Sequence, residues 1–276
     1  SYLYTVMYYD DHDRVIQRKS NNRLNGGVEK DYIAYNFIGQ PTKHKHIHSA
    51  AGKATQSEVY SYSYDYADRL QTTTHCLNNG PVMTLVNNEY DELGRLKHNR
   101  RNGQSNLHTN YAYNLRSWTE SISSPLFCKT LYYNDTRSNP TNTRYYNGNI
   151  SGMDWGVNGD KKRGYDFSYD NLSRLLYADY LENNIRNHNF NTSYNYDKQG
   201  NIVSLMRSGN QTTTYGIIDN LTLNYRGNQL IKVEDTASDS NLSVSSMDFR
   251  NGAKQDVEYF YDENGNLIKD LSLIHI

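Results

Sequence analysis

The chain has 276 residues, of which 29 are basic and 30 acidic, and its mean hydropathy is −0.90 with 36% of residues apolar. Because the charges are balanced and form no long block of one sign, the composition predicts no nucleic-acid partner. No apolar run is long enough for a membrane-spanning helix, and the first residues lack the pattern of a signal peptide, so any targeting segment is expected upstream. The 27 tyrosines favour β-strands, since a Tyr-rich sheet can hold together without an aliphatic core.

In chain order, the predicted elements are copies of one unit, aromatic-x-Tyr-Asp-x-x-Gly-Arg-Leu. Clear copies are YSYDYADRL, NEYDELGRL, FSYDNLSRL, YNYDKQGNI and YFYDENGNL, and weaker ones lie between them, including the contracted YYNGNI and NYRGNQL. Steps between copies span 23 to 36 residues. The second aromatic residues of the copies are Tyr9, Tyr35, Tyr64, Tyr90, Tyr113, Tyr146, Tyr169, Tyr196, Tyr225 and Tyr261.

Each copy predicts a strand, a tight turn and a return strand. The two aromatics project from one face of a strand, and the Asp carboxylate can accept a hydrogen bond from the backbone two residues later. The Gly three positions after Asp suits a left-handed turn residue. Where Gly is missing, the position is held by Asp13, Asp68, Ser117 and Ser173.

The connecting segments predict further hairpins, with turns at 78–80 and at Gly209 and Asn210. No segment has a sustained helical period, so very little helix is expected. We predict an all-β fold with one continuous array over residues 1–270, cut at both ends. Residues 271–276 form a non-repeat tail that is either a genuine strand or an artefact.

These motifs, with the YNLRSW, YNGNISGMDW and YRGNQLIKVED stretches, resemble RHS/YD repeats of the Bacteroidetes-like type found in long surface and secreted proteins. The resemblance covers about residues 4–270. It implies a curved or spiralling sheet that is part of a hollow shell, often enclosing a toxin domain C-terminal to the array in the same polypeptide. The proline- and aspartate-rich motif that ends such shells is missing, so neither self-cleavage nor toxic activity is carried over.

Few residues point to chemistry. His44, His46 and His48 alternate on a predicted strand, where they suit an exposed polar strand better than a metal site, because one metal cannot reach all three. Trp118 and Trp155 favour burial in the sheet over sugar stacking. The repeat carboxylates are expected to form turns rather than to act as acids or bases: Asp10, Asp65, Asp91, Asp170, Asp197 and Asp262.

Cys76 and Cys128 fit either a disulfide or two separate thiols. No catalytic, cofactor-binding or metal-binding residue is predicted, no cofactor is expected, and the chain is not expected to be an enzyme. The sequence therefore predicts a structural scaffold of a secreted or cell-surface protein, with a toxin domain of the same polypeptide as its partner. The alternative is a surface adhesin that binds carbohydrate or protein through exposed aromatic residues.

Overall fold

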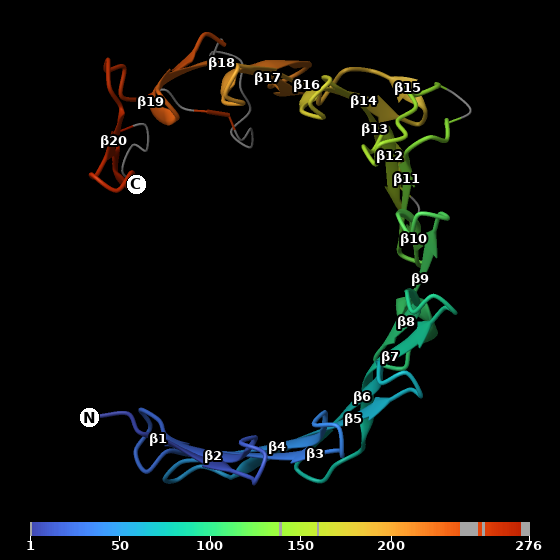
Figure 1. Cartoon of the computed structure of the whole chain (residues 1–276), viewed down its shortest axis with the longest axis vertical. Helices are drawn as coiled ribbons and strands as arrows, with labels where there is room; N and C mark the ends of the chain where they lie inside the picture. Colours follow the sequence, from blue (N-terminus) through green and yellow to red (C-terminus); the bar gives the residue numbers. More distant parts are fainter. Residues whose placement is uncertain (1, 138–139, 159, 238–247, 250–251, 272–276) are drawn as a thin grey trace. The chain divides into compact units, whose positions relative to one another are not determined.

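The computed structural model describes residues 2–137, 140–158, 160–237, 248–249 and 252–271, and these residues are arranged in β-strands without an α-helix (Figure 1). The chain divides into two compact units, Ser1–Cys128 and Lys129–Ile276. This confirms the predicted all-β fold of hairpins. No helix in the described part of the chain is long and apolar enough to cross a membrane.

The first unit is an antiparallel meander in which each strand pairs with the next. A short 3-10 turn, Ser105–Leu107, is the one helical element described, and it lies between the eighth and ninth strands. The strands are β1 (Thr5–Tyr9), β2 (Val15–Asn21), β3 (Val28–Tyr35), β4 (Pro41–Ser49), β5 (Gln56–Tyr64), β6 (Leu70–Leu77), β7 (Met83–Tyr90), β8 (Leu96–Arg101), β9 (His108–Tyr113) and β10 (Thr119–Ser123).

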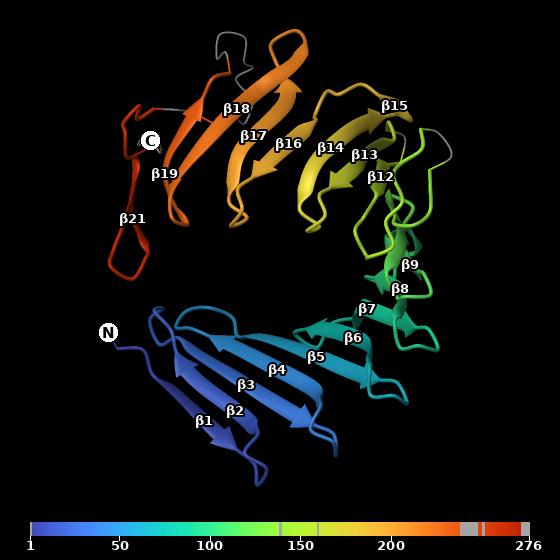
Figure 2. The same ribbon diagram turned by 45° about the horizontal axis from the view of Figure 1, so that its top comes forward.

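The second unit continues the hairpin pattern with two interruptions. The first lies between β11 and β12, where no strand is described, and the second is β15, which pairs with the end of β14 before β16 returns to β14 (Figure 2). A separate hairpin, β20 and β21, follows. The strands are β11 (Phe127–Tyr132, which begins in the first unit), β12 (Gly152–Val157), β13 (Arg163–Tyr169), β14 (Leu175–Glu182), β15 (Ile185–Arg186), β16 (Thr192–Tyr196), β17 (Ile202–Asn210), β18 (Tyr215–Arg226), β19 (Gln229–Asp235), β20 (Tyr259–Tyr261) and β21 (Leu267–Asp270).

The repeat turns have the predicted geometry. In the turn after β7, the Asp91 carboxylate accepts hydrogen bonds from the backbone N–H groups of Leu93 and Arg95, and Gly94 has a φ of 82°. The register shifts beside the tyrosine, so that Tyr90 pairs with Leu96 across the turn. The four residues that replace Gly also adopt positive φ: Asp13, Asp68, Ser117 and Ser173.

We expect Gly94→Val to lower the free energy of unfolding by about 1–3 kcal/mol, because a β-branched residue is strained at positive φ. Leu93→Ala is the matched control, since the Leu93 side chain is exposed at the same turn. Thermal melts of both variants check this. Equal losses of stability would show that the left-handed position does not limit the turn.

Two predicted turns are wrong. Gly209 and Asn210 lie within β17, paired with Gly216 and Tyr215, and the chain reverses over 211–214 instead. Gly209 is needed for close approach, because a Cβ there would lie 2.7 Å from the Cδ1 atom of Ile218. The contracted copy at 145–150 forms no hairpin either, and Tyr146 lies outside any strand. The turn predicted at 78–80 is confirmed between β6 and β7.

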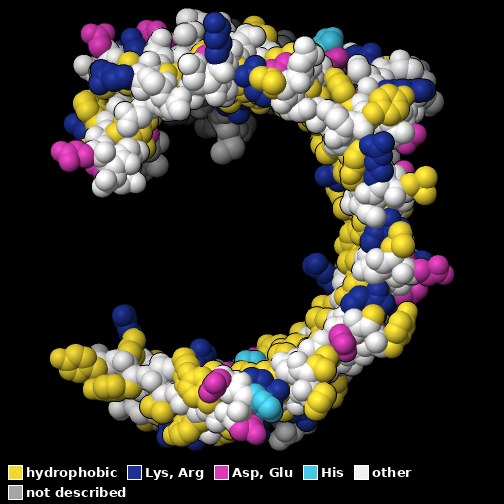
Figure 3. Space-filling view, in the orientation of Figure 1, with side chains coloured by type: hydrophobic (Ala, Val, Ile, Leu, Met, Phe, Trp, Pro, Cys, Tyr) yellow, Lys and Arg dark blue, Asp and Glu magenta, His cyan; other side chains and the backbone are white. Residues whose placement is uncertain are grey.

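The apolar core is small. The described apolar residues that are buried all belong to the second unit: Tyr133, Ala178, Tyr180, Leu181, Ile218, Val233 and Tyr259. Apolar side chains are visible on the surface along both units in Figure 3. Backbone pairing and contacts between side chains of adjacent repeats must therefore provide much of the stability.

Candidate functional site

The repeats are joined by their YD tyrosines. The hydroxyl of Tyr90 donates a 2.9 Å hydrogen bond to the backbone carbonyl of Leu70, the residue that pairs with the tyrosine of the preceding repeat. The same bond recurs in both units, at 2.7 to 3.0 Å, from Tyr35 to Val15, Tyr64 to Pro41, Tyr113 to Leu96, Tyr169 to Ile150, Tyr196 to Leu175, Tyr225 to Ile202 and Tyr261 to Leu230.

The arginine of the motif adds a second contact between neighbouring repeats. Arg69 forms an ion pair with Asp65 of its own turn at 2.7 Å, and its guanidinium lies 4.5 Å from the ring centroid of Tyr90 in the next repeat. Equivalent stacks place Arg14 over Tyr35, Arg95 over Tyr113 and Arg174 over Tyr196, and these three arginines also donate to the next turn's first carbonyl. We call this set of contacts, hydroxyl to carbonyl and guanidinium over ring, the repeat joint.

The three alternating histidines lie on β4 and face carboxylates of β3. Asp31 contacts His44 at 3.0 Å and His46 at 2.8 Å, and Glu29 contacts His48 at 2.6 Å. These acidic partners were missed in the sequence analysis. They follow from the hairpin register, because the turn that pairs Tyr35 with Pro41 aligns Asp31 with His46.

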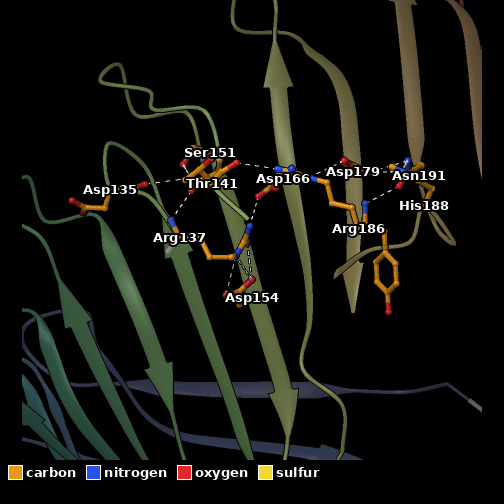
Figure 4. A network of polar contacts seen from close by, with 12 residues as sticks. Asp135, Arg137, Thr141, Ser151, Asp154, Asp166, Asp179, Arg186, His188 and Asn191 are labelled. Carbon is orange, nitrogen blue, oxygen red and sulfur yellow. Dashed lines mark hydrogen bonds and ion pairs between the residues drawn. The ribbon is translucent and has the colours of Figure 1, made fainter. Parts of the chain in front are cut away.

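A buried ion-pair network lies where the repeat pattern breaks, between β11 and β12 (Figure 4). The Arg137 guanidinium is only 3% exposed and contacts Asp154 at 2.6 Å; it also forms an ion pair with Asp166. Glycines of β12 and β13 make room for it: a Cβ on Gly164 would lie 2.5 Å from an Asp154 oxygen, and one on Gly152 would lie 3.2 Å from Arg137.

The second interruption of the repeat is β15, and its residue Arg186 contacts the same network. Arg186 of β15 bridges Asp166 at 2.6 Å and Asp179 at 3.2 Å, two carboxylates that oppose each other directly on β13 and β14. Beyond Asp179, His188 and Asn191 continue the chain of polar contacts (Figure 4). A cavity of about 360 Å³ adjoins this end, lined by Tyr177, His188, Asn191, Thr192, Ser193, Met206, Ser208 and Ile217.

The network is built from fixed charges. Burial alone would raise the pKa of Asp154, but hydrogen bonds from Arg137 and Lys162 bring the pKa below its usual value. The pKa of Arg137 is raised by its two carboxylate partners despite burial. Groups held this firmly in one charge state are poor general acids or bases near neutral pH, which makes a structural role the best account of their geometry.

The lowered carboxylate pKa values predict acid sensitivity. For Asp31, as for Asp154, burial opposes ionisation but hydrogen bonds from His46, His44 and Arg18 lower the pKa. Such groups stabilise the fold above their unfolded pKa of about 3.9, and the stabilisation is lost as the pH falls through the lower folded value. We therefore expect urea midpoints to fall steeply below about pH 4. A midpoint that rises between pH 4 and 3 would contradict these assignments.

The two tryptophans noted in the sequence each stack on another side chain. Trp118 occupies the arginine position of its turn, under the guanidinium of Arg116, and Trp155 stacks on Tyr165 with centroids 5.7 Å apart. Both indoles are half-buried, so neither is a freely exposed sugar platform. Cys76 and Cys128 are not joined in a disulfide. No three His, Cys, Asp or Glu side chains among the described residues gather as a metal-binding group.

Comparison with known proteins gives distant structural likeness only. No family model and no curated protein matches the chain. The structure of TcdB2-TccC3 with Cdc42 aligns over 96% of this chain at 10% identity with a TM-score of 0.31, and this chain spans 17% of that one. A porin-like protein from Bacteroides uniformis aligns over 84% of this chain and 92% of its own, at 10% identity and a TM-score of 0.22. TM-scores this low support no conclusion about function.

Proposed function

We propose that this chain is a section of a structural wall in a secreted or cell-surface protein, and that it has no enzymatic activity of its own. The observation that supports this most directly is the repeat joint, which recurs in both units with the same atoms and similar distances. Because each repeat joint involves only two neighbouring repeats, any number of repeats can be linked in this way. Other repeat proteins likewise gain their stability from neighbour contacts.

In its finer form, the proposal is that the wall encloses a toxin domain encoded C-terminal to the array in the same polypeptide. Limited proteolysis of a longer polypeptide that includes the downstream domain tests it. We expect the downstream domain to resist digestion when the array is intact, and to be cleaved when Tyr64, Tyr90 and Tyr113 are changed to Phe. Digestion at the rate of the isolated downstream domain would contradict enclosure.

A row of apolar residues at the hairpin tips favours a second candidate, a surface adhesin. In the first unit, the tip side chains of four turns are at least 72% exposed: Phe37, Tyr66, Leu93 and Leu115. Apolar residues that gather on one surface commonly mark contact with a partner, and these four side chains lie at alternate turns of the first unit's meander, on one side of the sheet. A selective glycan-array or protein-binding signal that disappears in a tip variant, Tyr66→Ser with Leu115→Ser, would support the adhesin over the wall.

A further inference from the structure

Two histidines of the first unit approach each other on one face of the sheet. His98 lies on β8 and His108 on β9, and the strand register aligns His98 with Glu89 on one side and Asn110 on the other. The side chains of three neighbouring strands therefore converge. They line a cavity of about 210 Å³ formed by Asn87, Glu89, His98, Arg100 and His108.

Three polar side-chain atoms of His98, His108 and Asn110 lie close together beside this cavity. The Nδ1 atom of His98 lies 2.5 Å from the Asn110 Oδ1 atom and 3.4 Å from the Nε2 atom of His108. The rings meet edge to face, with centroids 5.2 Å apart. The contact with Asn110 has the length of a hydrogen bond, whereas at the contact with His108 two imidazole nitrogens face each other at a longer distance.

The two facing imidazole nitrogens have the spacing of metal ligands. Zinc binds imidazole nitrogen at about 2.0–2.1 Å, so two nitrogens on a tetrahedral ion lie about 3.3 Å apart, close to the separation of His98 and His108. We propose that His98 and His108 form a binding site for a divalent transition-metal ion such as Ni²⁺ or Zn²⁺, which would replace the hydrogen bond between His98 and Asn110. The site lies apart from the repeat joints and from the network around Arg137.

The composition of the site sets its strength and selectivity. Two imidazoles favour Ni²⁺, Cu²⁺ or Zn²⁺ over Mg²⁺ or Ca²⁺, which prefer oxygen ligands alone. Glu89 faces the same cavity and is 63% exposed, with Lys97 at 3.5 Å, so its carboxylate is available to balance the charge of the ion. Arg100, also in the lining, opposes a cation. The result is a site that a chelator empties readily.

The alternating histidines of β4 are the natural comparison. There, His44, His46 and His48 each have a ring nitrogen already in contact with a carboxylate of β3. Those nitrogens face carboxylates, whereas at His98 and His108 two imidazole nitrogens face each other. The two clusters thus offer a test within one molecule.

Calorimetric titration of the whole chain with Ni²⁺, and separately with Zn²⁺, tests the site. We expect one saturable event that is reversed by EDTA and weakened at least tenfold by His98→Gln or His108→Gln, and little changed by the control variant His44→Gln with His48→Gln. Mg²⁺ should give no event. Circular dichroism of each variant verifies the fold. Unchanged affinity in folded His98→Gln and His108→Gln, or loss of the event in the β4 control alone, would overturn the proposal.

Discussion

Arg137→Met is expected to lower the free energy of unfolding of the second unit by about 3–5 kcal/mol, because it leaves buried carboxylates without their main counter-ion. Asp154 is 4% exposed and would keep Lys162, at 2.9 Å, and the hydrogen bond from the Tyr132 hydroxyl, at 3.0 Å, while Asp166 would keep Arg186. The backbone N–H of Arg137 donates to Asn142 Oδ1, and this bond is kept in the variant. Loss of the guanidinium removes its contacts with Asp154 and Asp166 together.

The two tryptophans allow this to be measured unit by unit, because Trp118 lies in the first unit and Trp155 in the second. In a Trp118→Phe background, denaturant unfolding followed by Trp155 fluorescence reports on the strand that carries Asp154. Arg144→Met, an exposed arginine of the same segment, is the matched control and should cost less than about 0.5 kcal/mol. A loss of under 1 kcal/mol for Arg137→Met would mean that the network does not stabilise the unit.

The second large effect is expected from the repeat joints of the first unit. Changing Tyr64, Tyr90 and Tyr113 together to Phe deletes three hydroxyls that bind carbonyls of the preceding repeats. Each half-buried hydrogen bond contributes about 1 kcal/mol, so the triple variant should lose about 2–4 kcal/mol. Trp118 fluorescence in a Trp155→Phe background measures the loss.

The motif itself supplies the control for that experiment. Tyr62 and Tyr111 are the first aromatics of the same copies, and their hydroxyls make no hydrogen bond to another described residue. Tyr62→Phe with Tyr111→Phe removes the same atoms from the same strands, and the change should be within about 0.5 kcal/mol. Similar losses in both variants would show that ring burial, and not the hydroxyl bond, holds the repeats together.

Much of the fold was readable from the sequence because the repeat encodes local geometry. Asp91 and Gly94 specify their turn through contacts within five residues. The same turn geometry is found at Ser117 and Ser173, which adopt positive φ although they are not glycine. The prediction of a turn was wrong at Gly209, because this glycine makes room for Ile218 of the neighbouring strand.

The candidate sites were less predictable, because their contacts depend on pairing between strands or on segments outside the repeat. The carboxylate partners of the β4 histidines require the register of β3 against β4. Arg137 lies in the 133–151 segment, where no motif signals a buried cation, and its partner Asp166 is 29 residues away. The tyrosine joint requires knowing which carbonyl of the preceding repeat lies within reach of the hydroxyl.

The most direct test of the central claim, that each repeat is held by its immediate neighbour, is a double-mutant cycle between Arg69 and Tyr90. Their guanidinium and ring are 4.5 Å apart across one joint. Arg69→Met and Tyr90→Leu should show a coupling energy of about 1 kcal/mol in the unfolding of the first unit. The cycle between Arg69 and Tyr113, one repeat further on, should be additive. No coupling in the first cycle, or equal coupling in both, would contradict the account.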